Sequence, residues 1–253
     1  MLEENKIHLG DCLDLMPSIP SKSVDMILCD LPYGTTACEW DSIIDMGRLW
    51  REYERIIKDN GAIVLTANAK FTFLLGASNI KLLRYKWVWM KTRKTMFLQA
   101  NKMPLRQHED ILIFYKSLPT YNPQKEACQI KKTSHKKTTV KANQTWNKNL
   151  VRIETNNNGL SYPSDLLSID DIDAKTIHPT QKPQALFEYL IKTYTNENEL
   201  VLDNCSGSGT TAVACMNTNR RFICIERDET YHKKSLERLA NHEPLLHMLS
   251  AYK

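Results

Sequence analysis

The sequence predicts an α/β protein in which helices cover both faces of a mostly parallel sheet. Two observations lead to this prediction. Short apolar runs alternate along the chain with longer stretches whose apolar residues recur at helical spacing. This alternation is typical of right-handed crossovers between parallel strands. The runs themselves, such as VDMILC at 24–29, are apolar at almost every position, as expected for strands buried on both faces.

Each element has its own signal in the sequence. The stretch 42–61 carries apolar residues at helical spacing, and we interpret Gly61 as its stop. The run LVLDN at 200–204 predicts a strand, and TTAVACMN at 210–217 predicts the helix that follows it. The expected strands are 24–30, 62–67, 85–91, 111–116, 200–204 and 220–226, and the expected helices are 42–61, 70–82, 183–195, 210–217 and 227–241.

Between Ser117 and about Thr176 the periodicity disappears. Asn, Lys, Thr and Ser dominate this stretch, and no glycine occurs in it before Gly159. It is too long for an ordinary connection, so we expect a functional insertion or a small subdomain. The expected organisation is a first half at 1–116, an insertion at 117–176 and a second half at 177–253.

The positive charge of the chain is concentrated in that insertion. The formal net charge is +5, yet the segment 125–152 alone has seven Lys and one Arg against Glu126. A basic segment on an otherwise balanced body favours a polyanionic partner, most simply nucleic acid. A solvated lysine-rich loop explains the same charge equally well.

The seven cysteines show no CxxC spacing, so neither a disulfide framework nor a zinc site is expected. The start of the chain has no apolar signal core, and no run reaches membrane-spanning length. We therefore expect a cytoplasmic protein with reduced thiols, no metal and no membrane partner.

A glycine turn follows the strand at 200–204 in the stretch VLDNCSGSGTTAVA. Gly207 and Gly209 let a ligand approach the backbone at the start of a helix. The next strand ends at Glu226, 23 residues after Asp203, where nucleotide-binding folds place an acid that binds ribose. The turn matches neither GxGxxG nor a phosphate loop. It favours a nucleoside ligand without pyrophosphate, such as S-adenosylmethionine, over a purely structural turn.

Several motifs together carry a family resemblance. DLPY at 30–33, HPTQKP at 178–183 and DNCSGSGTT at 203–211, with HLGD at 8–11 and HEDILIFYK at 108–116, resemble the beta class of DNA amino-methyltransferases in kind and order. The resemblance covers nearly the whole chain outside 117–176. It implies a Rossmann-like, circularly permuted sheet of seven strands with an inserted target-recognition region. It also implies DNA methylation of the kind found in restriction–modification.

The same resemblance implies a catalytic loop. Asp30, Leu31, Pro32 and Tyr33 would receive an adenine flipped out of duplex DNA and hold its amine for methylation. The strands at 24–30 and 200–204 would lie side by side, so that this loop faces the glycine turn. Leu31 stands where the family usually has proline, and Asn204 with Cys205 stand where it more often has Pro-Phe.

The methyl donor implied by the resemblance is S-adenosylmethionine. Asp11 and Cys12 would lie at its adenine ring, Glu226 at its ribose, and Asp203 with the 206–209 loop along its methionine part. The complete set of expected donor residues is Asp11, Cys12, Asp30, Pro179, Thr180, Lys182, Asp203, Asn204, Ser206, Gly207, Gly209 and Glu226.

The insertion occupies the position of the target-recognition region in the beta class. Its expected DNA contacts are Lys131, Lys132, Lys136, Lys137 and Lys141 to phosphates and Trp146 as a stacking or wedge residue, with Asn143, Gln144 and Asn147 as candidates for base edges. A second basic stretch, 91–106, is expected to flank the catalytic mouth and to become ordered on DNA. Cytosine-N4 methylation, a catalytically silent DNA-binding partner and an RNA substrate remain as alternatives, and a homodimer is possible by analogy.

Overall fold

The computed structural model describes residues 1–34, 42–127, 159–170 and 181–242. The chain forms two compact units. The larger unit consists of Met1–Asn122 and Ser164–Lys253, and the smaller one is Pro123–Pro163. The smaller unit is shorter in sequence than the expected insertion at 117–176. Its described residues include two short antiparallel strands, β6 (Glu126–Ala127) and β7 (Leu160–Ser161).

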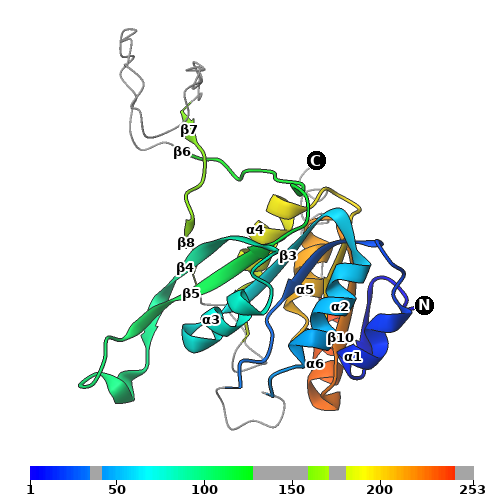
Figure 1. The fold of residues 1–253 in the computed structure, drawn as a ribbon, viewed down its shortest axis with the longest axis horizontal. Helices are drawn as coiled ribbons and strands as arrows, with labels where there is room; N and C mark the ends of the chain where they lie inside the picture. The colour runs from blue at the N-terminus through cyan, green and yellow to red at the C-terminus, as the bar shows by residue number, and fades with distance from the viewer. Residues whose placement is uncertain (35–41, 128–158, 171–180, 243–253) are drawn as a thin grey trace. The chain divides into compact units, whose positions relative to one another are not determined.

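The larger unit is built on one eight-stranded sheet with the order β1-β10-β9-β2-β3-β5-β4-β8 (Figure 1). Its strands are β1 (Lys6–Leu9), β2 (Val24–Cys29), β3 (Ile57–Ala67), β4 (Leu83–Thr95), β5 (Arg106–Phe114), β8 (Leu166–Ser168), β9 (Leu200–Asp203) and β10 (Arg221–Glu226). All neighbouring pairs are parallel except those that β5 makes with β3 and β4. The sheet is thus mostly parallel, as predicted. It has one strand more than the resemblance implied, because β8 adds to β4 at the edge.

Helices cover both faces of this sheet. They are α1 (Cys12–Leu15), α2 (Met46–Ile56), α3 (Ala69–Ser78), α4 (Gln184–Tyr194), α5 (Thr210–Asn217) and α6 (Glu229–Ala240), with short 3-10 turns at η1 (Met16–Ser18) and η2 (Phe97–Gln99). Successive side chains of β2 point to opposite faces of the sheet and belong to two separate hydrophobic cores. Ile27 and Cys29 pack with residues of α2 and α3, whereas Met26 and Leu28 pack with residues of α4 and α5.

Several predicted boundaries were wrong: α3 ends at Ser78 rather than at 82, β5 begins at Arg106 rather than at 111, and a further error lies between α2 and β3. The helix expected at 42–61 ends at Ile56, and β3 begins at Ile57 rather than at 62. Gly61 is not a helix stop but a strand residue beside β2. A Cβ there would lie 2.7 Å from the backbone oxygen of Asp25, which explains the glycine. The stretch 91–106, expected to become ordered only on DNA, here forms a hairpin of β4, η2 and β5 (Figure 1).

The strand registers bring the predicted site residues to one edge of the sheet. Leu9 in β1 pairs with Glu226 in β10, Cys224 pairs with Asp203 in β9, and Ile27 in β2 pairs with Leu202. The expected neighbourhood of strands 24–30 and 200–204 is therefore confirmed. Because these strands are parallel, the segments after Leu9, Cys29, Asp203 and Glu226 leave the sheet on the same side.

Candidate functional site

Asp30 follows β2 directly and is the centre of a cluster of polar contacts, which we call the Asp30 cluster (Asp30, Tyr33, Thr66, Glu109 and Lys182). The Tyr33 hydroxyl donates to Asp30 Oδ1 at 2.6 Å, and the buried Thr66 hydroxyl donates to the same oxygen. Lys182 Nζ donates to Asp30 Oδ2 at 2.6 Å. Both carboxylate oxygens are therefore engaged in this state of the protein.

Tyr33 presents a fixed aromatic ring beside this carboxylate. Its ring stacks on Phe71 of α3, with centroids 4.8 Å apart, and its hydroxyl lies 3.1 Å from Thr66 Oγ1. Burial, followed by the negative charges of Asp30 and Glu109, raises the pKa of the Tyr33 phenol well above its usual range. The hydroxyl thus remains protonated and can keep donating to Asp30.

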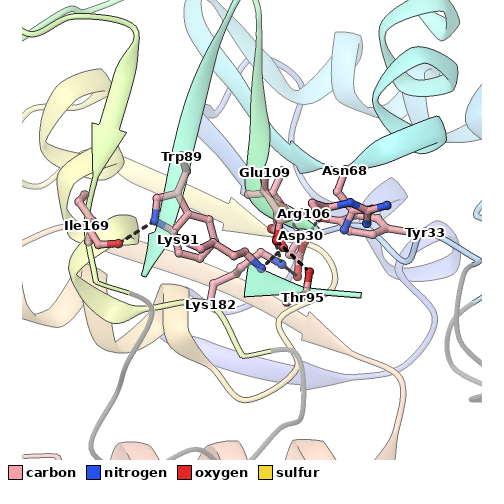
Figure 2. Close-up of polar contacts among 11 residues, drawn as sticks. Asp30, Tyr33, Asn68, Trp89, Lys91, Thr95, Arg106, Glu109, Ile169 and Lys182 are labelled. Carbon is pink, nitrogen blue, oxygen red and sulfur yellow. Dashed lines mark hydrogen bonds and ion pairs between the residues drawn. The ribbon is translucent and has the colours of Figure 1, made fainter. Parts of the chain in front are cut away.

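A second carboxylate, Glu109 of β5, lies near the Lys182 ammonium (Figure 2). Glu109 Oε2 is 3.5 Å from Lys182 Nζ, while Oε1 forms an ion pair with Lys91 of β4. The Lys182 side chain is only 8% exposed. Burial alone would lower the pKa of Lys182, but the carboxylates of Asp30 and Glu109 outweigh burial and raise it. Lys182 is therefore a buried ammonium held by two carboxylates.

The predicted glycine turn connects β9 to α5. Gly207 and Gly209 have φ values of 50° and 74°, in the left-handed region that favours glycine. The Gly207 N–H donates to Glu226 Oε2 at 2.7 Å, and the Asp228 N–H donates to Glu226 Oε1 at 2.8 Å. Burial raises the pKa of Glu226 above its usual value. The glycine turn and Glu226, at the end of β10, are thus joined by a hydrogen bond.

Asp203 is buried at the end of β9. Its carboxylate accepts the Cys205 N–H at 3.1 Å and the hydroxyl of Thr211. Burial nevertheless raises its pKa to about 7, against the effect of these donors. The carboxyl group of Asp203 therefore titrates near neutral pH.

Asn204 and Cys205, which depart from the family pattern, have defined partners. The Tyr53 hydroxyl of α2 donates to Asn204 Oδ1 at 2.5 Å. Asn204 Nδ2 lies 3.5 Å from Cys12 Sγ and 3.4 Å from Cys205 Sγ. The Asn204 side chain therefore anchors the turn to α1 and α2.

The structure brings together most of the predicted residues that it describes. Asp11 caps α1 by accepting the Leu13 N–H at 2.8 Å, and the Leu31 side chain is buried in the core while Pro32 is half-buried. Lys182, expected at the methyl donor, contacts Asp30 and Glu109. Outside the described residues lie Pro179, Thr180, Lys131, Lys132, Lys136, Lys137, Lys141, Asn143, Gln144, Trp146 and Asn147.

Sequence reasoning missed Thr66, Lys91 and Glu109. Glu109 stands within HEDILIFYK, where the acidic pair just before an apolar run was the available signal for a carboxylate at a strand. Within the described ranges, no group of three or more His, Cys, Asp or Glu side chains is arranged to hold a metal ion. The helices described there all lack the length and apolar character for crossing a membrane.

Comparison with known proteins relates this chain to DNA methylases. The sequence model of the family described as DNA methylase matches residues 24–237. The DNA adenine methyltransferase YhdJ of Escherichia coli is 27% identical over 94% of this chain and 83% of its own length. Type II methyltransferase M1.MboII of Moraxella bovis is 28% identical over 91% of this chain and 95% of its own length.

Solved structures share the fold at lower identity. The cytosine-N4-specific PvuII DNA methyltransferase superimposes with a TM-score of 0.68 at 18% identity, covering 96% of this chain and 89% of that one. The complex of M1.HpyAVI with S-adenosylmethionine gives 0.62 at 22% identity, covering 92% and 98%. Because the family match includes β2, the Asp30 cluster and the glycine turn, this chain belongs to the DNA methylase family.

Proposed function

We propose that this protein transfers a methyl group to the N6 amine of an adenine flipped out of duplex DNA. The observation that carries the proposal is the position of Asp30. Its carboxylate is held at the end of β2, next to the strand that leads into the glycine turn. The relative YhdJ, named a DNA adenine methyltransferase, supports adenine as the target.

The chemistry requires a hydrogen-bond acceptor at this position. The lone pair of the exocyclic amine is conjugated with the base, so the amine is a poor nucleophile. An acceptor aimed at its N–H groups shifts electron density back to nitrogen and favours the tetrahedral geometry of attack. Asp30 Oδ2 and the Leu31 carbonyl would supply such acceptors, and Pro32 would restrict the loop that carries them.

Tyr33 would receive the flipped base by stacking. Phe71 supports its ring, and the bond to Asp30 fixes the hydroxyl end. Stacking is worth about 1–3 kcal/mol per base, comparable with the few kcal/mol that unstacking costs. A preformed aromatic platform can therefore offset much of the cost of extracting the base.

The methyl donor is S-adenosylmethionine, which supplies an electrophilic methyl group when it is bound. The residues at the sheet edge fit this group. Asp11, Asp30, Asp203 and Glu226 all follow or end strands at the same edge, and the Asp30 carboxylate suits a ligand that carries a sulfonium and an ammonium. Glu226 already accepts two backbone N–H groups and retains lone pairs for ribose hydroxyls.

DNA would be contacted by residues around this edge. The β4–β5 hairpin carries Arg93, Lys94 and Lys102, and its exposed Phe97 and Leu98 lie in η2 at the turn. The lysines of the insertion and Trp146 are proposed to make further contacts, with phosphates providing affinity rather than sequence choice.

Cytosine-N4 methylation is the second candidate, because the cytosine-N4-specific PvuII enzyme shares the fold. The two candidates are separated by digesting DNA treated with purified protein and labelled S-adenosylmethionine, and identifying the methylated nucleoside by mass. We expect N6-methyladenine; N4-methylcytosine would overturn the assignment.

The catalytic role of Asp30 is tested in the same assay. Asp30→Ala should abolish transfer, whereas Asp59→Ala, at an exposed strand residue paired with Lys22, should not change it. Transfer that survives Asp30→Ala would exclude this role. Absence of transfer by the wild-type protein to DNA would favour the silent binding partner.

A further inference from the structure

We propose that Lys182 is a latch on the catalytic carboxylate and that Glu109 is the positioning residue that releases it. This inference rests on the proposed function, because it concerns how the target amine gains access to Asp30. Lys182 Nζ donates to Asp30 Oδ2 (Figure 2). The hydroxyls of Tyr33 and Thr66 donate to Oδ1. A base amine that approaches Asp30 Oδ2 therefore competes with the Lys182 ammonium for this oxygen.

Lys182 is the donor that lies near a second carboxylate. Thr66 is fully buried, and the Tyr33 ring is held against Phe71. By contrast, Lys182 Nζ already lies 3.5 Å from Glu109 Oε2. That oxygen is buried and accepts no hydrogen bond from the residues that the structure describes. Shortening this contact to the 2.6 Å of the Asp30 pair requires a shift of about 1 Å.

The charges of the network allow this exchange. Lys91 holds Glu109 Oε1 and thereby leaves Oε2 directed to Lys182. The two lysines and two carboxylates sum to zero, and they still do so after Lys182 moves from Asp30 to Glu109. After the exchange Asp30 keeps the hydroxyl donors of Tyr33 and Thr66 and gains the N–H of the base, and its charge stays balanced within the neutral network, because an uncompensated buried charge would be costly.

The ammonium also lies at the stacking surface. Lys182 Nζ is 5.6 Å from the centroid of the Tyr33 ring, within the range of a cation–π contact. A base that enters the site therefore competes with Lys182 for the Asp30 carboxylate and for contact with the Tyr33 ring. Without Glu109, the only carboxylate left to the ammonium among its described ion-pair partners is Asp30.

The experiment compares Glu109→Gln with Asp110→Asn. Asp110 is the next residue of β5 and is also a buried carboxylate, but it pairs with Lys86 and Thr72. The target site is first located by sequencing modified bases. The readouts are 2-aminopurine fluorescence at the target position in the presence of an unreactive donor analogue, single-turnover methyl transfer, donor affinity and the melting temperature.

Glu109→Gln should lower base flipping and single-turnover transfer by about 10-fold or more, the value of one charged hydrogen bond. The affinity of Glu109→Gln for S-adenosylmethionine should stay within about twofold of that of the wild type. Asp110→Asn should leave base flipping and transfer within the same limit, and Glu109→Asp, which keeps the charge, should recover part of the loss.

A second comparison isolates the role of Lys182. In a Lys182→Met background the added Glu109→Gln change should have almost no effect on base flipping, because no latch remains to be released. The inference is overturned if Glu109→Gln leaves flipping unchanged, if Asp110→Asn impairs it equally, or if the loss is the same in both backgrounds. Failure of the wild-type protein to methylate DNA would instead overturn the proposed function.

Discussion

Asp203 makes the stability of the protein depend on pH near neutrality. Burial raises the pKa of its carboxyl group from 3.8 to about 7 in the folded protein. The folded state therefore binds the proton more tightly than the unfolded state does. The resulting stabilisation is fully present below the unfolded pKa and is lost as the pH rises through about 7. A difference of about 3 pKa units corresponds to about 4 kcal/mol in the free energy of unfolding.

Asp203→Asn removes this titration while preserving the shape of the side chain. The amide oxygen can still accept the Cys205 N–H, and the Thr211 hydroxyl can rotate to accept from the amide nitrogen. The wild-type protein should lose about 1.4 kcal/mol per pH unit relative to the variant between about pH 4 and 7. Other titrating groups are common to both proteins, so their contributions cancel in the difference.

The assay is urea unfolding of both proteins at pH 5, 6, 7 and 8 at constant ionic strength. The free energy of unfolding of the wild-type protein minus that of the variant should decrease from pH 5 to 7 and level off above it. A difference that is the same at pH 5 and pH 8 would show that Asp203 is already ionised at pH 5 and would refute the argument from burial.

Two further predictions concern ligand binding. Glu226→Gln should weaken S-adenosylmethionine binding, measured by calorimetry, by about 10-fold or more. The reason is that either the Gly207 or the Asp228 N–H loses its acceptor, and the ribose loses a charged acceptor. Unchanged affinity would show that Glu226 does not bind S-adenosylmethionine. In a filter-binding assay, Tyr33→Leu should reduce the affinity for target-site DNA by about 5- to 150-fold, the value of one stacked base. Tyr33→Phe should retain most of the affinity, because its ring can still stack on Phe71. Equal losses in the two variants would argue against stacking.

The sequence predicts the sheet edge well because the signal there is local. A carboxylate or a glycine directly after an apolar run must lie where a parallel strand ends, so Asp30, Gly207 and Glu226 could be placed from their strands alone. The helix α5 begins at Thr210, as predicted, for the same reason, since the glycine turn fixes its start.

Other features depend on contacts between distant residues. Ile56 and Ile57 suit a helix or a strand equally, and the strand begins before the glycine because Ile57 pairs with Val24 of β2. Strand β8 has three residues, too few to show a period, and it exists because β4 offers an unpaired edge. The pairing of Lys182 with Glu109 joins positions 73 residues apart, for which no local pattern exists.

The side chain of Asn204 also depends on contacts with distant residues. A buried amide costs free energy unless its polar atoms find partners. Here the Tyr53 hydroxyl supplies one from α2, and the sulfurs of Cys12 and Cys205 lie within reach of the amide nitrogen. Two of the partners come from separate segments, α1 and α2, and the third is the neighbouring residue in the turn, so the Asn204 amide keeps its partners only while α1 and α2 stay in place. The Asn204 side chain thus fixes the glycine turn to α1 and α2. Rigid placement is what the two halves of the site need, because in-line transfer depends on the orientation of the reacting groups.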